Sequence, residues 1–62
     1  MNNIKFFRLE QGLSQENLSV MANLSVGYIC HLEKGSRNNP SMRTISKLCI
    51  ALNKNKDELF PD

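Results

Sequence analysis

The chain has 62 residues, enough for a single small domain over residues 1–62 but not for an effector domain or a catalytic cleft beside it. Hydrophobic residues make up 40% of the chain, and the formal net charge at pH 7 is only +2. No apolar run is long enough for a signal peptide or a membrane span, so we expect a cytoplasmic protein with no membrane partner.

The chemistry-bearing side chains are few. Two cysteines, Cys30 and Cys49, are too few for a disulfide framework. We expect both to be reduced and to pack as small residues in or beside the core. One histidine and two cysteines give no zinc set, and the adjacent Cys30 and His31 point apart on a helix, so they cannot pair as nucleophile and base. The sequence therefore predicts no enzyme, no metal, no cofactor and no small-molecule effector.

The first predicted helix covers Ile4–Gln11. Asn2 or Asn3 caps its start, because an asparagine side chain accepts hydrogen bonds from the free backbone N–H groups there. Gly12 ends it, since glycine readily takes the left-handed conformation that closes a helix. Its core face carries Ile4 and Phe7, and Leu13 fills the gap before the next helix.

The segment Leu13–Gly35 predicts two short amphipathic helices joined by a tight turn. Ser14 caps the first helix and Ser25 the second. Asn23 lies at the turn, where asparagine is the best residue after glycine for a left-handed backbone. Gly35 ends the second helix. Two helices closed by so short a turn must cross steeply, which is the helix-turn-helix arrangement of DNA-binding proteins.

The rest of the chain predicts a polar loop over 36–40 and two more helices. Ser41 caps a fourth helix that ends near Asn53, and Asn55 caps a last short helix that Pro61 terminates. The fold class is therefore all-α, a compact domain of five helices without strands. We expect its core to contain Leu18, Leu24, Ile29, Leu32, Ile45, Leu48 and Leu52, with Cys49 and Leu59 packed beside them.

The charges are unevenly placed along the chain. The stretch from Lys34 to Lys56 contains no acidic residue. Its basic residues are Lys34, Arg37, Arg43, Lys47, Lys54 and Lys56. A basic face turned toward an anionic partner and an ordinary solvated surface fit this pattern equally well, and the helix-turn-helix pattern beside it favours the first.

These motifs resemble the helix-turn-helix of phage repressors, Cro proteins and many small bacterial regulators. The resemblance runs from Ile4 to Leu59 and rests on the stretches IKFFRLEQGLSQ, LSVGYICHLEKG, NPS and ALNKNKDEL. Two departures suit the local geometry: Ser19 stands where the family usually has alanine, and Asn23 where it has the turn glycine. The resemblance implies a repressor-like domain that binds double-stranded DNA.

The resemblance also implies which residues of the second motif helix, 25–34, contact base edges in the major groove. The matching positions are Ser25, Val26, Gly27 and His31. Val26 offers only an apolar contact, for example with a thymine methyl, and Gly27 offers only its backbone. His31 is therefore the main polar reader, and its alternative role is that of a solvated surface residue. We expect few direct base contacts and a larger share for DNA shape.

Phosphate contacts, which position a protein on the duplex without reading its sequence, are implied as well. Gln15 opens the first motif helix, where free backbone amides favour an anion. The other matching candidates are Tyr28, Lys34, Ser36, Arg37, Asn38, Asn39 and Arg43. For Tyr28, packing alone is an equal alternative.

Two further sets follow from the resemblance. Arg8 and Glu33 match an arginine and a glutamate that form a structural ion pair in the family. Dimer contacts lie around the connection of the last two helices and the C-terminal end, which here offers Ile50, Asn53, Asn55 and Phe60. So small a patch predicts a homodimer that is weak in solution and assembles on DNA.

Some apolar residues fall where relatives more often have polar groups: Phe6, Leu9, Val20, Met21 and Ile50. Scattered surface hydrophobics are the favoured interpretation, and contact with a partner protein or a second subunit is the alternative. The sequence thus predicts a sequence-specific DNA-binding transcriptional regulator, with repression as the expected sign. The rival is a protein-interaction module, such as an antitoxin or a regulator partner, that keeps the fold and reads DNA weakly.

Overall fold

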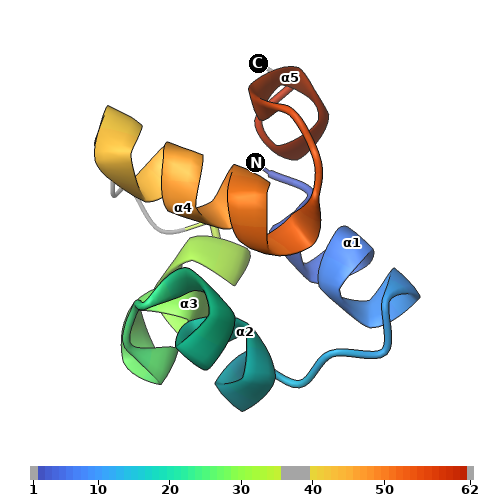
Figure 1. The fold of residues 1–62 in the computed structure, drawn as a ribbon, viewed down its shortest axis with the longest axis vertical. Coiled ribbons are helices and arrows are strands. Elements are labelled where there is room, and N and C mark those ends of the chain that lie inside the picture. Colours follow the sequence, from blue (N-terminus) through green and yellow to red (C-terminus); the bar gives the residue numbers. More distant parts are fainter. Residues whose placement is uncertain (1, 36–39, 62) are drawn as a thin grey trace.

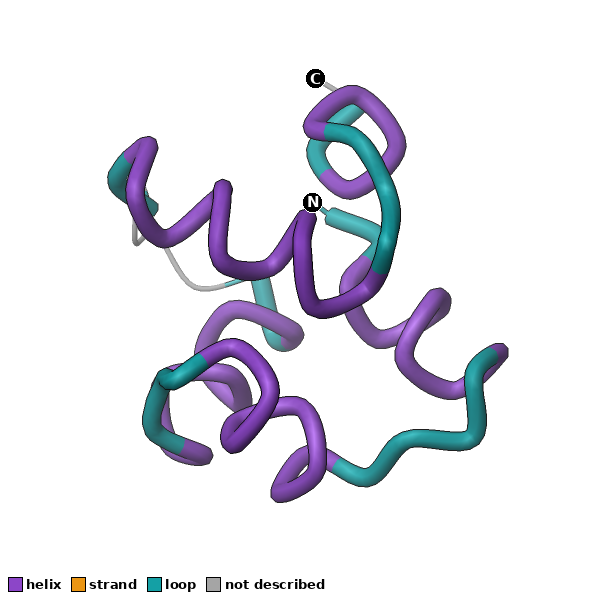
Figure 2. The backbone as a smooth tube through the Cα atoms, viewed as in Figure 1, coloured by secondary structure: helices purple, strands orange, loops and turns teal. Residues whose placement is uncertain are grey.

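The computed structural model describes residues 2–35 and 40–61. These residues form five α-helices and no strand, which confirms the predicted fold class. The helices are α1 (Ile4–Glu10), α2 (Gln15–Ala22), α3 (Val26–Glu33), α4 (Met42–Leu52) and α5 (Lys56–Leu59). Figure 1 shows α4 crossing the middle of the molecule, with α2 and α3 on one side of it and α5 on the other. Short connections join most of the helices, as the backbone tube in Figure 2 shows.

The predicted capping residues start four of the helices. Ser14, Ser25 and Ser41 have extended backbones, and each Oγ accepts a hydrogen bond from the N–H three residues later. Asn55 does the same for α5 and completes a capping box with Glu58. The chain therefore sets these helix boundaries by contacts within a single turn.

Asparagine ends two of the helices in the left-handed conformation. Asn23 closes α2 at φ 54°, as predicted, and Asn53 closes α4 at φ 55°. The first helix differs slightly from its prediction, because it ends at Glu10 rather than Gln11. At its start Asn3 makes no side-chain capping bond, and the Oδ1 of Asn2 accepts from the Ile4 N–H at 3.1 Å instead.

The core draws on all five helices. Its buried residues are Ile4, Leu18, Ala22, Ile29, Leu32, Leu48, Leu52 and Leu59. Leu24 is only half-buried at the edge of this cluster, although it packs against it. The prediction for Ile45 is wrong, since this residue is half-buried and lies outside the cluster. The buried residues of α4, Leu48 and Leu52, lie in its later turns, where α5 follows after residues 53–55, whereas Ile45 lies in its first turn.

Candidate nucleic-acid interface

The turn between α2 and α3 is held by its own backbone. The left-handed Asn23 reverses the chain, and the Leu24 N–H donates to the Ser19 carbonyl oxygen at 2.9 Å. Ser19 is buried where α2 packs near the turn, and its Oγ donates to the Glu16 carbonyl oxygen at 2.7 Å. The hydroxyl of this buried residue is therefore hydrogen-bonded within its own helix.

The start of α3 is turned toward solvent. Ser25, Val26 and Gly27 are all exposed, and so is His31 one turn after Gly27. Since residues four apart share a helix face, Gly27 and His31 lie on one side of α3. The opposite side carries the fully buried Ile29 and the nearly buried Leu32. The four predicted base-contacting residues thus lie on the part of α3 that the domain does not cover.

Packing among the described residues does not require a glycine at position 27. A Cβ added at this position would meet no heavy atom of those residues within 4 Å, and its backbone is helical. A glycine inside a helix costs about 0.8–1 kcal/mol relative to alanine. The structure described here supplies no contact that offsets this cost.

A buried ion pair fixes the other end of α3. Arg8 Nε lies 2.7 Å from Glu33 Oε2, and Arg8 Nη2 donates to Glu33 Oε1 at 3.1 Å. The two side chains are only 8% and 4% exposed. The pair that the resemblance implied is therefore present, and it joins α1 to α3.

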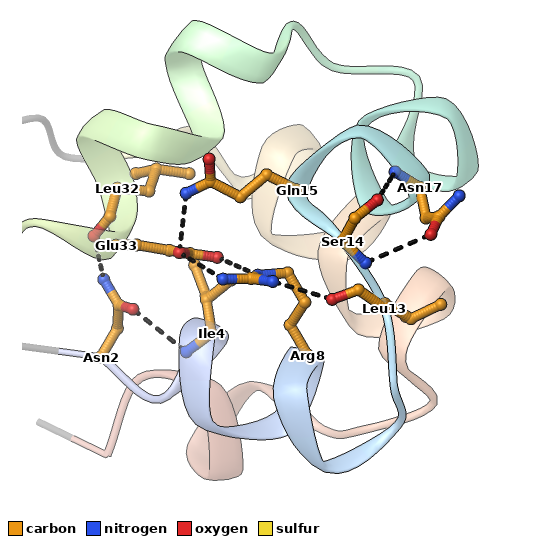
Figure 3. A network of polar contacts seen from close by, with 9 residues as sticks. All are labelled: Asn2, Ile4, Arg8, Leu13, Ser14, Gln15, Asn17, Leu32 and Glu33. Atoms are coloured by element: carbon orange, nitrogen blue, oxygen red, sulfur yellow. Dashed lines mark hydrogen bonds and ion pairs between the residues drawn. The ribbon is translucent and has the colours of Figure 1, made fainter.

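The same carboxylate also binds Gln15. Gln15 Nε2 donates to Glu33 Oε1 at 3.0 Å, and Arg8 Nη1 donates to the Leu13 carbonyl oxygen at 2.8 Å. Figure 3 shows Arg8 and Gln15 converging on Glu33 from two sides. One N–H of the Gln15 amide is thus committed inside the domain, and the start of α2 is held against the end of α3. A phosphate contact by Gln15 would use its other side-chain N–H or its backbone.

The remaining phosphate candidates differ in their surroundings. Lys34 and Arg43 are exposed, at the C-cap of α3 and in the first turn of α4. Tyr28 is half-buried and packs against the core. The other four candidates, Ser36, Arg37, Asn38 and Asn39, lie outside the described residues.

The predicted dimer residues are also unlike one another. Ile50 is 81% exposed on α4, and Asn53 and Asn55 are exposed at the connection to α5. Phe60 is half-buried and packs against the core, so part of its ring contributes to the domain itself.

The Nζ of Lys54 lies 4.8 Å from the centroid of the Phe7 ring and thus covers an apolar side chain of α1.

Several exposed hydrophobic side chains are present. Phe6 and Leu9 are more than half exposed on α1, and Phe6 packs edge-on against Phe7 with ring centroids 5.1 Å apart. Met42, which the sequence analysis did not single out, is also exposed at the start of α4. Within the described part of the chain, no helix could cross a membrane. There, too, no group of three or more metal-ligating side chains gathers.

Sequence reasoning missed four side-chain contacts that span the fold. Asn2 reaches the end of α3, Asn3 reaches the end of α5, Gln11 reaches the end of α4, and Gln15 reaches Glu33. Each joins residues at least 18 positions apart. A single sequence carries no local signal for such a pair. The partner of a capping serine, in contrast, is predictable because it lies three residues away.

Comparison with known proteins places the chain in a family. The family described as Helix-turn-helix matches residues 4–59. Among solved structures, the restriction-modification controller protein C.AhdI from Aeromonas hydrophila matches with a TM-score of 0.84 and 36% sequence identity, over 94% of this chain and 86% of that chain. The comparison with curated proteins finds no match. The chain therefore belongs to the helix-turn-helix family of repressor and Cro type, and it is a DNA-binding transcriptional regulator.

Proposed function

We propose that this regulator binds double-stranded DNA in a sequence-specific way, with α3 in the major groove, and that it represses transcription by occupying its site. The observation that carries the proposal is the exposed start of α3 around Gly27. The major groove is wide enough for a helix and presents a different pattern of donors, acceptors and methyl groups for each base pair. A glycine that packing among the described residues does not require allows the backbone of α3 to approach those groups closely.

The base contacts are divided among few side chains. His31 donates a hydrogen bond to a guanine acceptor or another base edge, and Val26 contacts a thymine methyl. Ser25 contacts a base edge near the start of the helix. Because only His31 is a strong polar reader, DNA shape contributes much of the discrimination.

Phosphate contacts flank α3 on both sides. Lys34 and Arg43 carry exposed charges at the end of α3 and the start of α4. Gln15 and the free backbone amides at the start of α2 provide a neutral phosphate contact. Tyr28 and the segment 36–39, with Ser36, Arg37, Asn38 and Asn39, complete the set.

We further propose that two chains bind one near-palindromic site. Ile50, Asn53, Asn55 and the exposed part of Phe60 form the contact between the chains. Two copies of α3 then enter successive major grooves about 34 Å apart. The patch is too small for a stable dimer in solution, which needs about 1,200–2,000 Å², so DNA holds the pair together.

The setting we propose is restriction–modification control, because C.AhdI, with 36% identity over nearly the whole chain, is described as such a controller. In this setting the protein acts in the cytoplasm, where the bacterial or phage DNA lies. It needs no small-molecule effector, since occupancy of the site is the whole mechanism.

A second candidate function is that of a protein-interaction module. The exposed Phe6 and Leu9 on α1 and Val20 on α2 favour it, since these side chains have no role in the DNA contact proposed above. The acid-free stretch from Lys34 to Lys56 favours DNA.

Selection of bound sites from a random duplex library tests the proposal. We expect an enriched near-palindromic sequence whose affinity for the protein falls steeply as salt rises, because bound phosphates release counterions. Gly27→Glu places an acid on the exposed face of α3, where an added Cβ meets no heavy atom of the described residues within 4 Å, and is expected to abolish binding. Binding without enrichment, or a Gly27→Glu variant that binds normally, would contradict the proposal.

A further inference from the structure

Asn2 joins two helices by its side chain. Its Nδ2 donates to the Leu32 carbonyl oxygen at 2.8 Å, and its Oδ1 accepts from the Ile4 N–H at 3.1 Å. Figure 3 shows the Asn2 amide between the end of α3 and the start of α1. One amide group thus caps α1 and at the same time holds the last turn of α3.

The next residue continues this connection to α5. The Asn3 backbone N–H donates to the Leu59 carbonyl oxygen at 2.8 Å, and its Nδ2 donates to the Glu58 carbonyl oxygen at 2.9 Å. Residues 2–3 therefore join the end of α3 to the end of α5 by hydrogen bonds. We refer to these two residues as the N-terminal clip.

The clip binds a main-chain group of α3, whereas the hydrogen bonds of Arg8 and Gln15 to α3 go to the Glu33 side chain. The Leu32 carbonyl oxygen also accepts from the Gly35 N–H at 3.1 Å, so Asn2 provides its second hydrogen bond. A side chain such as Glu33 can turn about its own bonds, but a main-chain carbonyl moves only with its helix. Since α3 has eight residues and is about 12 Å long, a small tilt at its end shifts the exposed start.

We propose that Asn2 is a positioning residue for DNA recognition. Its bond to Leu32 sets the angle at which α3 presents its exposed face, relative to α1 and, through Asn3, to α5. The proposal rests on the function proposed above, in which α3 enters the major groove. Base contacts need correct donor and acceptor geometry and phosphate contacts tolerate more, so a loss of Asn2 reduces specific binding more than non-specific binding.

Two substitutions separate the two hydrogen bonds of Asn2. Asn2→Ser keeps an oxygen that accepts from the Ile4 N–H, but its side chain is too short to reach Leu32. Asn2→Asp keeps the acceptor as well and has no donor for the Leu32 carbonyl oxygen. Both variants therefore retain the cap of α1 and lose the bond to α3.

The measurement is the ratio of the affinities for the selected duplex and for a scrambled duplex, at one salt concentration. We expect Asn2→Ser to lower this ratio about three- to tenfold, the loss that one hydrogen bond produces. Asn2→Asp adds a negative charge that weakens binding to both duplexes, but the ratio is expected to fall as it does for Asn2→Ser. Ratios that equal the wild-type ratio in both variants would overturn the proposal.

Gln11→Ala is the matched control. Gln11 Nε2 donates to the Leu52 carbonyl oxygen at 2.7 Å and so joins α1 to α4 instead of α3. This variant is expected to lower the urea midpoint by an amount similar to Asn2→Ser and to keep the affinity ratio of the wild type. An equal fall of the ratio in Gln11→Ala would show general loosening and would overturn a specific role for Asn2.

Gly27→Glu, measured in the same assay, separates the failure of this inference from the failure of the proposed function. If Gly27→Glu abolishes binding and Asn2→Ser leaves the ratio unchanged, the role of Asn2 is wrong and α3 still reads DNA. If Gly27→Glu binds normally, α3 is not the reading helix, and both proposals fall.

Discussion

The two ends of α3 are held in opposite ways. The last turn is fixed by Asn2 at the Leu32 carbonyl oxygen and by Arg8 and Gln15 at the Glu33 carboxylate. The start of α3 has a capping bond from the Tyr28 N–H to the Ser25 Oγ, and residues 25–27 are exposed. These long-range polar contacts to α3 therefore lie at its last turn, which packs inside the domain.

This difference teaches how a small domain can present a helix to a partner. Polar groups at the exposed start of α3 can bind a partner only where they are not already hydrogen-bonded within the domain. The contacts at the last turn restrict the motion of the whole helix. One end of this eight-residue helix is therefore accessible, and the other end holds it in place.

The largest expected effect comes from breaking the anchored end. Glu33→Ala leaves the buried charge of Arg8 without its ionic partner, which costs about 3–5 kcal/mol for such a pair. A domain of this size has only roughly 3–5 kcal/mol of net stability, so we expect the variant to be largely unfolded. Circular dichroism at 222 nm during a urea titration measures this, with Glu16→Ala on the exposed face of α2 as the control.

The double variant Arg8→Met with Glu33→Leu refines this prediction. Replacing both charges by apolar side chains removes the uncompensated charge, so most of the lost stability is expected to return. If the double variant is as unstable as Glu33→Ala, the cost lies in the lost hydrogen bonds to Leu13 and Gln15 and not in a buried charge.

The same contrast explains what the sequence predicts well. Ser14, Ser25, Ser41 and Asn55 cap their helices through a partner three residues away, so a local pattern is sufficient to locate them. Asn23 is predictable for the same reason, because the turn depends on its own backbone preference. The exposed start of α3 follows from these local signals.

The anchored end depends on partners far along the chain. The spacing of Arg8 and Glu33 contains no sign of their contact, which was expected only through the resemblance to a family. The hydrogen bonds of Asn2 and Gln11 were not expected even from that resemblance. Ile45 was misplaced because the helical period gives the apolar face of α4 but not how far along that face the neighbouring helices α2 and α5 cover it.

At the exposed end, His31→Ala is expected to weaken binding to the selected duplex by about 1–3 kcal/mol and to leave binding to a scrambled duplex nearly unchanged. Arg43→Ala is the counterpart, because a phosphate contact affects all sequences alike and its loss lowers the salt slope by about one unit. Fluorescence anisotropy at several salt concentrations distinguishes them. Identical behaviour of the two variants would contradict the separation of base-reading and phosphate-binding residues.

Gly27→Ala has opposite effects on folding and on binding. Alanine removes the helix cost of glycine, and its Cβ meets no heavy atom of the described residues within 4 Å, so the free energy of unfolding should rise by about 0.5–1 kcal/mol. Binding to the selected duplex should weaken, because the added methyl group occupies the space through which the backbone of α3 approaches the bases. A variant that is more stable and binds as tightly as wild type would show that this approach is not close.

The smallest effect on the single chain is expected for Ile50→Glu, since Ile50 is 81% exposed on α4 and outside the core. The urea midpoint should stay within the experimental error, because surface changes usually alter stability by less than about 0.5 kcal/mol. The acid should nevertheless disrupt the proposed contact between two chains. Sedimentation with the selected duplex is then expected to find two wild-type chains per duplex and mostly one chain of the variant. Two Ile50→Glu chains per duplex would move the dimer contact to another surface, and the exposed Phe6 and Leu9 on α1 would be the next to test.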